Sequence, residues 1–238
     1  MKQKKTKIFL GLWGFIVLLS LVPSLLQAEE SSVPLDKANI DITDLPSLQR
    51  GARIFMNYCS GCHSLKFVRY SSLGEGIGIV DASGVLLEEA IKKNLMFVGD
   101  KITDTIQRSM TNEEGAKWFE VNPPDLSLVA RSRGSDWLYT YLRSFYLDPK
   151  RPWGVNNTVF PDVAMPDALY YFRLQFQHEK EGQAKYDQAV LDLVNFLTYV
   201  GEPVQLVRKR IGIWVLLFLG VFFVFAYLLK REYWKDVH

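Results

Sequence analysis

The sequence predicts a mainly α-helical domain followed by one membrane-spanning helix. Apolar residues recur with a helical period in 48–58 and in 186–200, which predicts two amphipathic helices inside the domain. The run from Ile211 to Leu229 holds 19 residues without a charge. A helix of that length spans about 28 Å, close to the thickness of a bilayer core, so this run predicts the membrane helix.

The two predicted domain helices carry further signals. Leu48, Ala52 and Phe55 lie on one face of the first helix, and Gly51 on that helix allows a second helix to approach closely. Gly201 follows the apolar positions of the second helix and predicts its end. We therefore expect the two helices to cross at Gly51 and to form the scaffold of a small helical domain.

The charges are segregated along the chain. The whole chain has a formal net charge of +2, but Glu29–Val207 holds 18 basic and 24 acidic residues and so carries −6. A domain with that charge repels nucleic acid and attracts basic partners, which predicts no nucleic-acid function. A merely soluble acidic surface is the alternative interpretation.

The first 28 residues predict a secretory signal peptide. A lysine-rich start is followed by an apolar run from Ile8 to Leu19, and small Ala28 precedes two glutamates. The alternative is a retained membrane anchor. Because transit peptides are rich in arginine and serine, this start favours a bacterial protein. We expect 1–28 to be the signal peptide, 29–207 a periplasmic domain, and 208–238 the membrane anchor (211–229) with a short cytoplasmic tail.

The chemistry is concentrated in Cys59-Ser60-Gly61-Cys62-His63. Two thiols three residues apart can form thioether bonds with the two vinyl groups of one haem, and the adjacent imidazole can bind its iron. The sequence has no second cysteine pair for a zinc site, and no βαβ pattern surrounds the motif as in a thioredoxin-like dithiol. The motif predicts one covalent haem c per chain, and a lone disulfide is the alternative.

Met165 is the main candidate for the second axial ligand. Pro166 holds it outside helical geometry, so we expect it in an extended loop that can lie across a haem face. Met96, expected in the core, Met110, expected in a polar surface turn, and His178, expected on the surface, stay open as alternatives. A methionine ligand makes a six-coordinate electron carrier, whereas an open iron site suits a haem enzyme or a gas sensor.

Two arginines follow the block Pro123-Pro124-Asp125-Leu126-Ser127. The guanidinium groups of Arg131 and Arg133 match carboxylates such as the haem propionates. Ordinary surface arginines are the alternative interpretation.

The sequence resembles the cytochrome c1 family, in its proteobacterial form, over nearly the whole chain. The Cys-x-x-Cys-His motif is shared by many cytochromes, whereas the Pro-Pro-Asp-Leu-Ser block and the late Met-Pro pair are more specific. The matching segments are 50–52, 59–64, 67–70, 123–127, 130–133, 136–143, 156–157, 159–161, 165–166 and the C-terminal membrane helix.

The resemblance implies a class I-like cytochrome c domain with enlarged loops and one C-terminal transmembrane helix. It implies that Cys59 and Cys62 are the thioether sites and that His63 and Met165 are the axial ligands. In the family the second arginine after the Pro-Pro-Asp-Leu-Ser block approaches a haem propionate, a role that falls on Arg133.

The resemblance also implies the function: an electron-transfer subunit of the ubiquinol–cytochrome c reductase (bc1) complex. Its haem would take electrons from the Rieske iron-sulfur protein and pass them to a soluble or membrane-bound cytochrome c, which the acidic domain predicts to be basic. Cytochrome b and the Rieske protein are the implied partners, in a dimer of complexes in the bacterial inner membrane, with the haem domain on the periplasmic side.

We expect no enzymatic activity of the chain on its own, because the sequence shows neither a nucleophile–base arrangement nor a phosphate-binding loop. The chain would be the redox subunit of a larger complex. The alternative is another membrane-anchored monohaem c-type cytochrome that serves a different respiratory complex.

Overall fold

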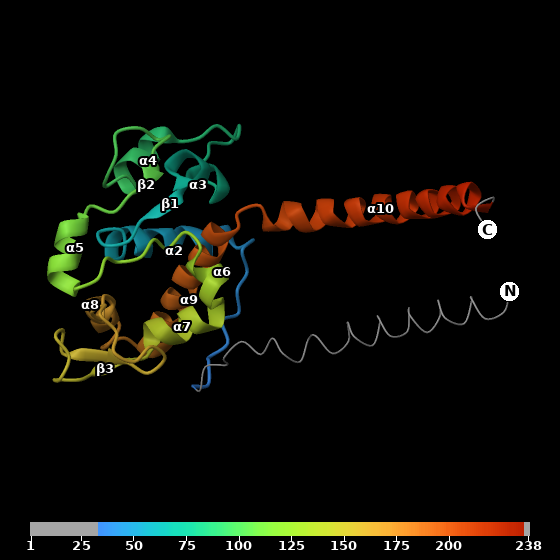
Figure 1. The fold of residues 1–238 in the computed structure, drawn as a ribbon. Helices are drawn as coiled ribbons and strands as arrows, with labels where there is room; N and C mark the ends of the chain where they lie inside the picture. Colours follow the sequence, from blue (N-terminus) through green and yellow to red (C-terminus); the bar gives the residue numbers. More distant parts are fainter. Residues whose placement is uncertain (1–32, 236–238) are drawn as a thin grey trace, which may run out of the picture. The chain divides into compact units, whose positions relative to one another are not determined.

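The computed structural model describes residues 33–235, and the predicted signal peptide at 1–28 lies outside them. Two helices form the centre of the domain: α2 (Leu45–Tyr58) and α9 (Gly182–Gly201) (Figure 1). Both were predicted from their apolar period, and both begin a few residues earlier than predicted. Asp44 caps the start of α2, where its side chain accepts a hydrogen bond from the Ser47 backbone N–H at 3.1 Å.

The two helices cross at Gly51, as predicted. A Cβ atom placed on Gly51 would lie 2.1 Å from the carbonyl oxygen of Asp192 and 2.6 Å from Cβ of Phe196. The Phe55 and Phe196 rings pack beside this point, with their centroids 5.7 Å apart. Only glycine therefore lets the helix axes come this close.

A buried carboxylate braces the same crossing. Asp192 of α9 accepts hydrogen bonds from Arg50 Nε at 2.6 Å and from Ser47 Oγ at 2.7 Å, both on α2. The Asp192 side chain is 3% exposed, so these donors compensate for the loss of water around its charge.

Shorter elements surround this pair. Helices α6 (Val129–Arg133) and α7 (Ser135–Arg143) pack against α9. The remaining short helices are α3 (Tyr70–Gly76), α4 (Glu88–Asn94), α5 (Asn112–Phe119) and α8 (Tyr170–Leu174). Two small antiparallel sheets pair β1 (Leu65–Arg69) with β2 (Thr105–Ile106) and β3 (Phe145–Leu147) with β4 (Val155–Asn157).

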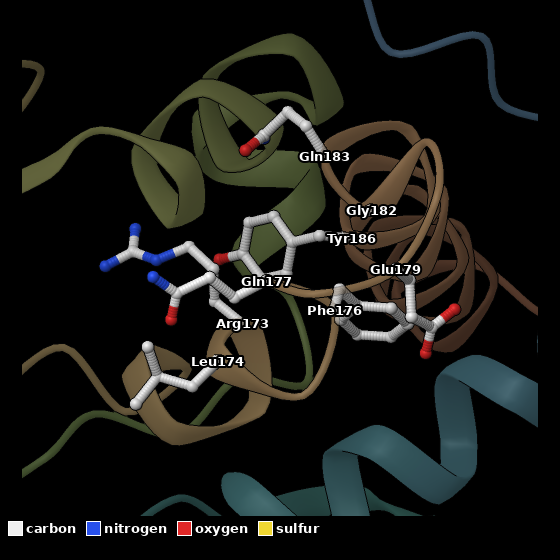
Figure 2. A pocket seen from close by; sticks show the side chains of 8 residues that line it. All are labelled: Arg173, Leu174, Phe176, Gln177, Glu179, Gly182, Gln183 and Tyr186. Atoms are coloured by element: carbon white, nitrogen blue, oxygen red, sulfur yellow. The ribbon is translucent and has the colours of Figure 1, made fainter.

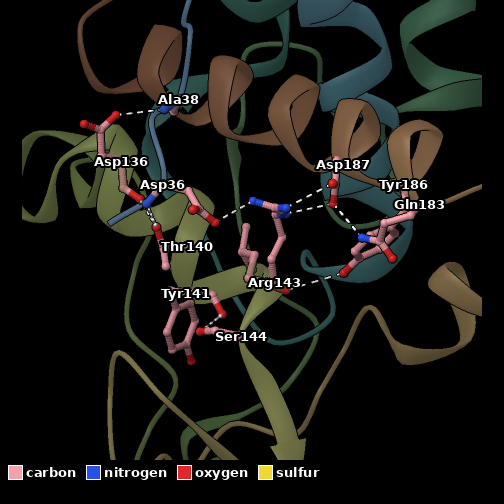
Figure 3. A network of polar contacts seen from close by, with 11 residues as sticks. Asp36, Ala38, Asp136, Thr140, Tyr141, Arg143, Ser144, Gln183, Tyr186 and Asp187 are labelled. Carbon is pink, nitrogen blue, oxygen red and sulfur yellow. Dashed lines mark hydrogen bonds and ion pairs between the residues drawn. The ribbon is translucent and has the colours of Figure 1, made fainter. Parts of the chain in front are cut away.

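The segment from Leu35 to Ala38 is tied to α7 (Figure 3). The Asp36 backbone N–H donates to Thr140 Oγ1 at 2.8 Å, and the Ala38 backbone N–H donates to Asp136 Oδ1 at 2.9 Å. We call 35–38 the N-terminal strap.

Arg143 joins this strap to α9. Its Nη1 donates to Asp36 at 2.8 Å, and its Nε and Nη2 bind the Asp187 carboxylate in bidentate fashion at 2.8 and 3.0 Å. The Tyr139 ring centroid lies 4.4 Å from the guanidinium carbon. One half-buried guanidinium thus connects three parts of the chain that are distant in sequence.

The predicted membrane helix is part of α10 (Gln205–Tyr233), which is longer than the predicted run 211–229. Its most apolar window has a mean hydropathy of 2.6, and none of that window is buried against the rest of the described chain. Its 29 residues extend over about 43 Å, so basic residues at both ends can reach the polar layers of a bilayer.

Candidate functional site

The motif cysteines and histidine lie on one tight turn that continues from the end of α2. The Cys59 backbone N–H donates to the Phe55 carbonyl at 2.9 Å. The Cys62 and His63 N–H groups both donate back to the Cys59 carbonyl, at 3.0 and 2.9 Å. These bonds bring the two thiols and the imidazole, predicted to act together, onto a single turn.

The two thiols are free, and their surroundings favour the protonated form. Burial, reinforced by the neighbouring Cys62, raises the pKa of Cys59 to about 12, and burial also raises the pKa of Cys62. Redox dithiols and nucleophilic cysteines need a lowered thiol pKa. Two thiols that stay protonated and lie on one turn fit a cofactor that is attached through sulfur.

The imidazole of His63 is oriented by a backbone carbonyl. Its Nδ1 lies 2.8 Å from the Pro124 oxygen, which can only accept a hydrogen bond, so the proton is on Nδ1 and the Nε2 lone pair is left for a metal. Burial lowers the pKa of His63 and favours the neutral form, which is the form that binds iron.

The Pro-Pro-Asp-Leu-Ser block is hydrogen-bonded to the chain that directly follows this turn. Asp125 Oδ2 accepts from the Lys66 backbone N–H at 2.9 Å, and Ser127 Oγ accepts from the Phe67 N–H at 3.2 Å. Arg108 Nη1 donates to the Pro123 carbonyl at 2.7 Å. Sequence reasoning missed Arg108, because nothing in its own neighbourhood marks it and its partner lies 15 residues away.

Met165 lies outside helical structure, as predicted, in the segment between β4 and α8, and it is partly buried. Its Sδ accepts a hydrogen bond from the Tyr141 hydroxyl at 3.4 Å. Burial raises the pKa of Tyr141, which keeps this hydroxyl a donor. Tyr141 was also missed from the sequence, since it is 24 residues from Met165.

Arg133 is exposed and lies beside aromatic rings. Its guanidinium carbon is 5.1 Å from the Trp137 ring centroid and 5.8 Å from that of Phe160. Arg133 forms no ion pair with a carboxylate of residues 33–235, so its charge is available to an acidic group of a ligand. Arg131 differs, because it lies 3.9 Å from Glu202.

Stacked rings connect Arg133 with Met165. Trp137, which lies under Arg133, stacks on Tyr141 with 4.9 Å between the ring centroids and 9° between the planes. Tyr141 in turn binds the Met165 sulfur. Two rings on one face of α7 thus connect the candidate propionate partner, Arg133, with the candidate ligand, Met165.

The motif turn also contacts the chain that follows Met165. Tyr58, the residue before Cys59, packs against Phe172 of α8 with 5.0 Å between ring centroids. Gln175 Nε2 donates to the Tyr58 hydroxyl at 3.4 Å. These contacts therefore connect α8, which begins five residues after Met165, to the end of α2, directly before the motif turn.

The alternative ligands occupy different surroundings. Met96 packs against the core as expected, and His178 is exposed as expected. Met110, expected in a polar surface turn, is partly buried, and its backbone N–H donates to the Gly61 carbonyl at 3.0 Å beside the motif.

A cavity of about 350 Å³ lies beside α8 and the start of α9 (Figure 2). Its lining mixes charged, amide and aromatic side chains, among them Arg173, Gln177 and Tyr186. None of the predicted site residues lines it. Burial raises the pKa of Tyr186 to about 12, and its hydroxyl donates to the Leu142 carbonyl at 3.4 Å.

Comparisons with known proteins identify one family. Residues 37–237 match the cytochrome C1 family. A protein named "Cytochrome c1" from Allochromatium vinosum is 48% identical over an alignment of 242 positions, gaps included. The alignment covers 92% of this chain and 96% of that protein. A "Cytochrome c1" from Rhodospirillum rubrum is 30% identical, with 89% and 91% covered.

A protein named "Ammonia monooxygenase gamma subunit" from Nitrosomonas europaea is 41% identical over 230 residues, which cover 92% of this chain and 95% of that protein. A solved structure titled "Hyperthermophilic respiratory Complex III" covers 95% of this chain at 18% identity with a TM-score of 0.42, a likeness too weak to carry an argument. The chain therefore belongs to the cytochrome c1 family: it carries covalently bound haem c and is a membrane-anchored electron-transfer subunit of a bc1 complex.

Proposed function

We propose that Cys59 and Cys62 form the two thioether bonds to the haem and that His63 and Met165 are its axial ligands. The observation that carries this assignment is the turn at 59–63, in which both thiols are free and Nε2 of a neutral imidazole is available. Bound in this way, the haem supplies one-electron chemistry, and the residues around it set its potential.

Arg133 is proposed as the partner of a haem propionate. Its support is a guanidinium that has no carboxylate partner among the described residues and that is held over Trp137 and Phe160. Oxidation adds one positive charge at the iron. A guanidinium that pairs with a propionate makes this step less favourable, because its own positive charge repels the added charge.

We further propose the path of the electron. The electron enters from the Rieske protein and leaves to a cytochrome c. This acceptor is basic, because Glu29–Val207 carries a formal charge of −6 and attracts positive charge. The domain would lie on the periplasmic side of a bacterial inner membrane, as the predicted signal peptide and α10 require. Transfer to a basic acceptor should therefore slow as ionic strength rises, since exposed charges are screened.

The ligand assignment is tested by replacing Met165 with alanine in the full chain, matured with haem. The variant should keep its covalent haem on a denaturing gel, lose the far-red sulfur-to-iron charge-transfer band of the oxidised protein, and bind carbon monoxide when reduced. Met96→Ala is the matched control and should leave the band unchanged. A Met165→Ala protein with the wild-type band would refute ligation by this residue.

The relative named as a monooxygenase subunit favours one second candidate, in which the chain delivers electrons within a different membrane complex. Purification in mild detergent separates the two. Co-purification with a multi-span haem b protein and a Rieske protein, at a mass that fits a dimer of complexes, supports the bc1 assignment. Co-purification with a different oxidoreductase supports the second candidate.

We also propose that the isolated chain does not oxidise quinol. Among residues 33–235, no group of three or more His, Cys, Asp and Glu side chains could bind a further metal ion. The purified complex should reduce cytochrome c with quinol, whereas the separated subunit should only exchange electrons with cytochrome c. Quinol oxidation by the separated subunit would contradict this proposal.

A further inference from the structure

We infer that Tyr141 is a positioning residue for Met165, whose sulfur it orients and makes a weaker electron donor through a hydrogen bond. The inference rests on the proposed ligation by Met165. Its basis is the contact between the phenolic oxygen and Sδ, which are 3.4 Å apart. Among the described residues, Sδ is the only hydrogen-bond partner of this hydroxyl.

The Tyr141 ring is held on two sides. Trp137 stacks on it with the centroids 4.9 Å apart, and Phe145 meets it edge-on at 5.3 Å with 66° between the planes. A phenol has only two side-chain torsions, and these contacts fix both. The packing of the ring therefore fixes the direction of the hydroxyl, which does not depend on where the sulfur lies.

One buried asparagine holds both the tyrosine and the chain that leads to the methionine. Asn157 Nδ2 donates to the Tyr141 carbonyl at 2.8 Å, and Asn157 Oδ1 accepts from the backbone N–H groups of Val159 at 3.0 Å and Phe160 at 3.2 Å. Asn157 is fully buried. The donor and the segment that carries its acceptor thus share one support, which fixes their separation.

The hydrogen bond has a direct effect on the ligand. A thioether sulfur has two lone pairs, and a phenol that donates to one of them leaves the other for a metal and fixes its direction. The bond also draws electron density from the sulfur. Because oxidised iron gains more than reduced iron from an electron-rich ligand, a weaker donor favours the reduced state and raises the reduction potential.

The test is Tyr141→Phe in the full chain with haem, because phenylalanine keeps the ring and its stacking and removes only the donor. We expect a lower midpoint potential and a shifted charge-transfer band in the oxidised state, at unchanged haem content. Tyr139→Phe is the matched control: it lies on the same helix, its ring is under Arg143, and its hydroxyl makes no hydrogen bond to Met165. It should match the wild type.

A double-mutant cycle tests whether the effect of Tyr141 on the potential passes through the Met165 sulfur. In a Met165→His background, Tyr141→Phe should shift the potential much less than in the wild type, because no sulfur is left to accept the bond. An equal shift in both backgrounds would assign the effect to the local environment and overturn the inference.

Ligation by Met165 and the role of Tyr141 are tested by different results. If Met165→Ala keeps the charge-transfer band, the proposed ligand is wrong. If Met165→Ala loses the band while Tyr141→Phe and Tyr139→Phe both equal the wild type in potential and spectrum, the ligand stands and only the role of Tyr141 is refuted.

Discussion

The His63 Nδ1 atom lies 2.8 Å from the carbonyl oxygen of Pro124, 61 residues away in the sequence. This contact gives the Pro-Pro-Asp-Leu-Ser block a structural role. The rings of Pro123 and Pro124 lock φ at both positions, so the carbonyl of Pro124 faces the imidazole from a chain segment with few alternative conformations. The block thus fixes both the tautomer and the direction of the ring.

Arg108 should stabilise the contact between His63 and Pro124, because it donates a hydrogen bond to the preceding carbonyl, that of Pro123, at 2.7 Å. We expect Arg108→Ala to destabilise the haem-loaded protein by about 1–2 kcal/mol. This is the lower part of what a hydrogen bond with a charged group contributes, because Arg108 is partly exposed to water. Urea unfolding followed at the haem absorption band measures it. Lys117→Ala, at an exposed position, is the control, and equal midpoints for the two variants would contradict the assigned role.

The two cysteines should contribute separately to haem attachment. Cys62→Ala leaves one thioether bond, so we expect haem to remain on a denaturing gel while the pyridine haemochrome band moves to longer wavelength, because one vinyl group stays conjugated. Replacing Cys59 as well should abolish staining. Ser60→Ala should stain and absorb like the wild type, and haem retained by the double variant would disprove attachment at these residues.

Gly51→Ala should destabilise the domain, because the added methyl group would lie 2.1 Å from the Asp192 carbonyl oxygen and force the helices apart. We expect a loss of about 1–3 kcal/mol, the usual cost of overpacking a core. Thermal unfolding of the detergent-solubilised chain measures it. Gly212→Ala in α10 meets no described atom within 4 Å and should leave the melting temperature of the haem domain unchanged.

Asp136 should make stability depend on pH in the acid range. The Lys37 ammonium and the Ala38 N–H hold the pKa of Asp136 below 3.8. Figure 3 shows the contact with Ala38. A lowered carboxyl pKa stabilises the fold at pH above 3.8, and this contribution is lost as pH falls through the lowered value. Asp136→Asn should therefore cost less than about 1 kcal/mol at neutral pH, because the exposed Lys37 is screened by water.

The same measurement separates this effect from general acid unfolding. The difference between the wild type and Asp136→Asn should shrink to zero in strong acid, where the wild-type carboxyl is protonated too. Asp100→Asn, whose carboxylate makes no hydrogen bond to another described residue, should follow the wild type throughout. A difference between the wild type and Asp136→Asn that stays constant with pH would contradict the assignment.

The sequence predicted those parts of the fold whose signal is local. The apolar period located α2 and α9, the uncharged run located the core of α10, and Gly51 marked the crossing. The two small sheets were not predicted, because strands of two to five residues are too short to show alternation, and β2 holds only Thr105 and Ile106.

The candidate site was predictable to the same extent. Its cysteines and histidine form a contiguous motif, and Pro166 placed Met165 in a loop. Tyr141, Arg108 and Asn157 were missed because their partners are 15 to 24 residues away, and only the folded chain brings them together. The roles of the ligands stay predictions until Met165 and its neighbours are replaced.

The crossing of α2 and α9 also sets the order in which the domain can mature. Ser47 and Asp192, which meet there, are 145 residues apart, so their contact closes a very long loop and forms late in folding. Both cysteines precede α9, which packs on α2, by more than a hundred residues in the chain. We expect an enzyme that attaches haem to a newly made chain to meet both cysteines before α9 has packed on α2.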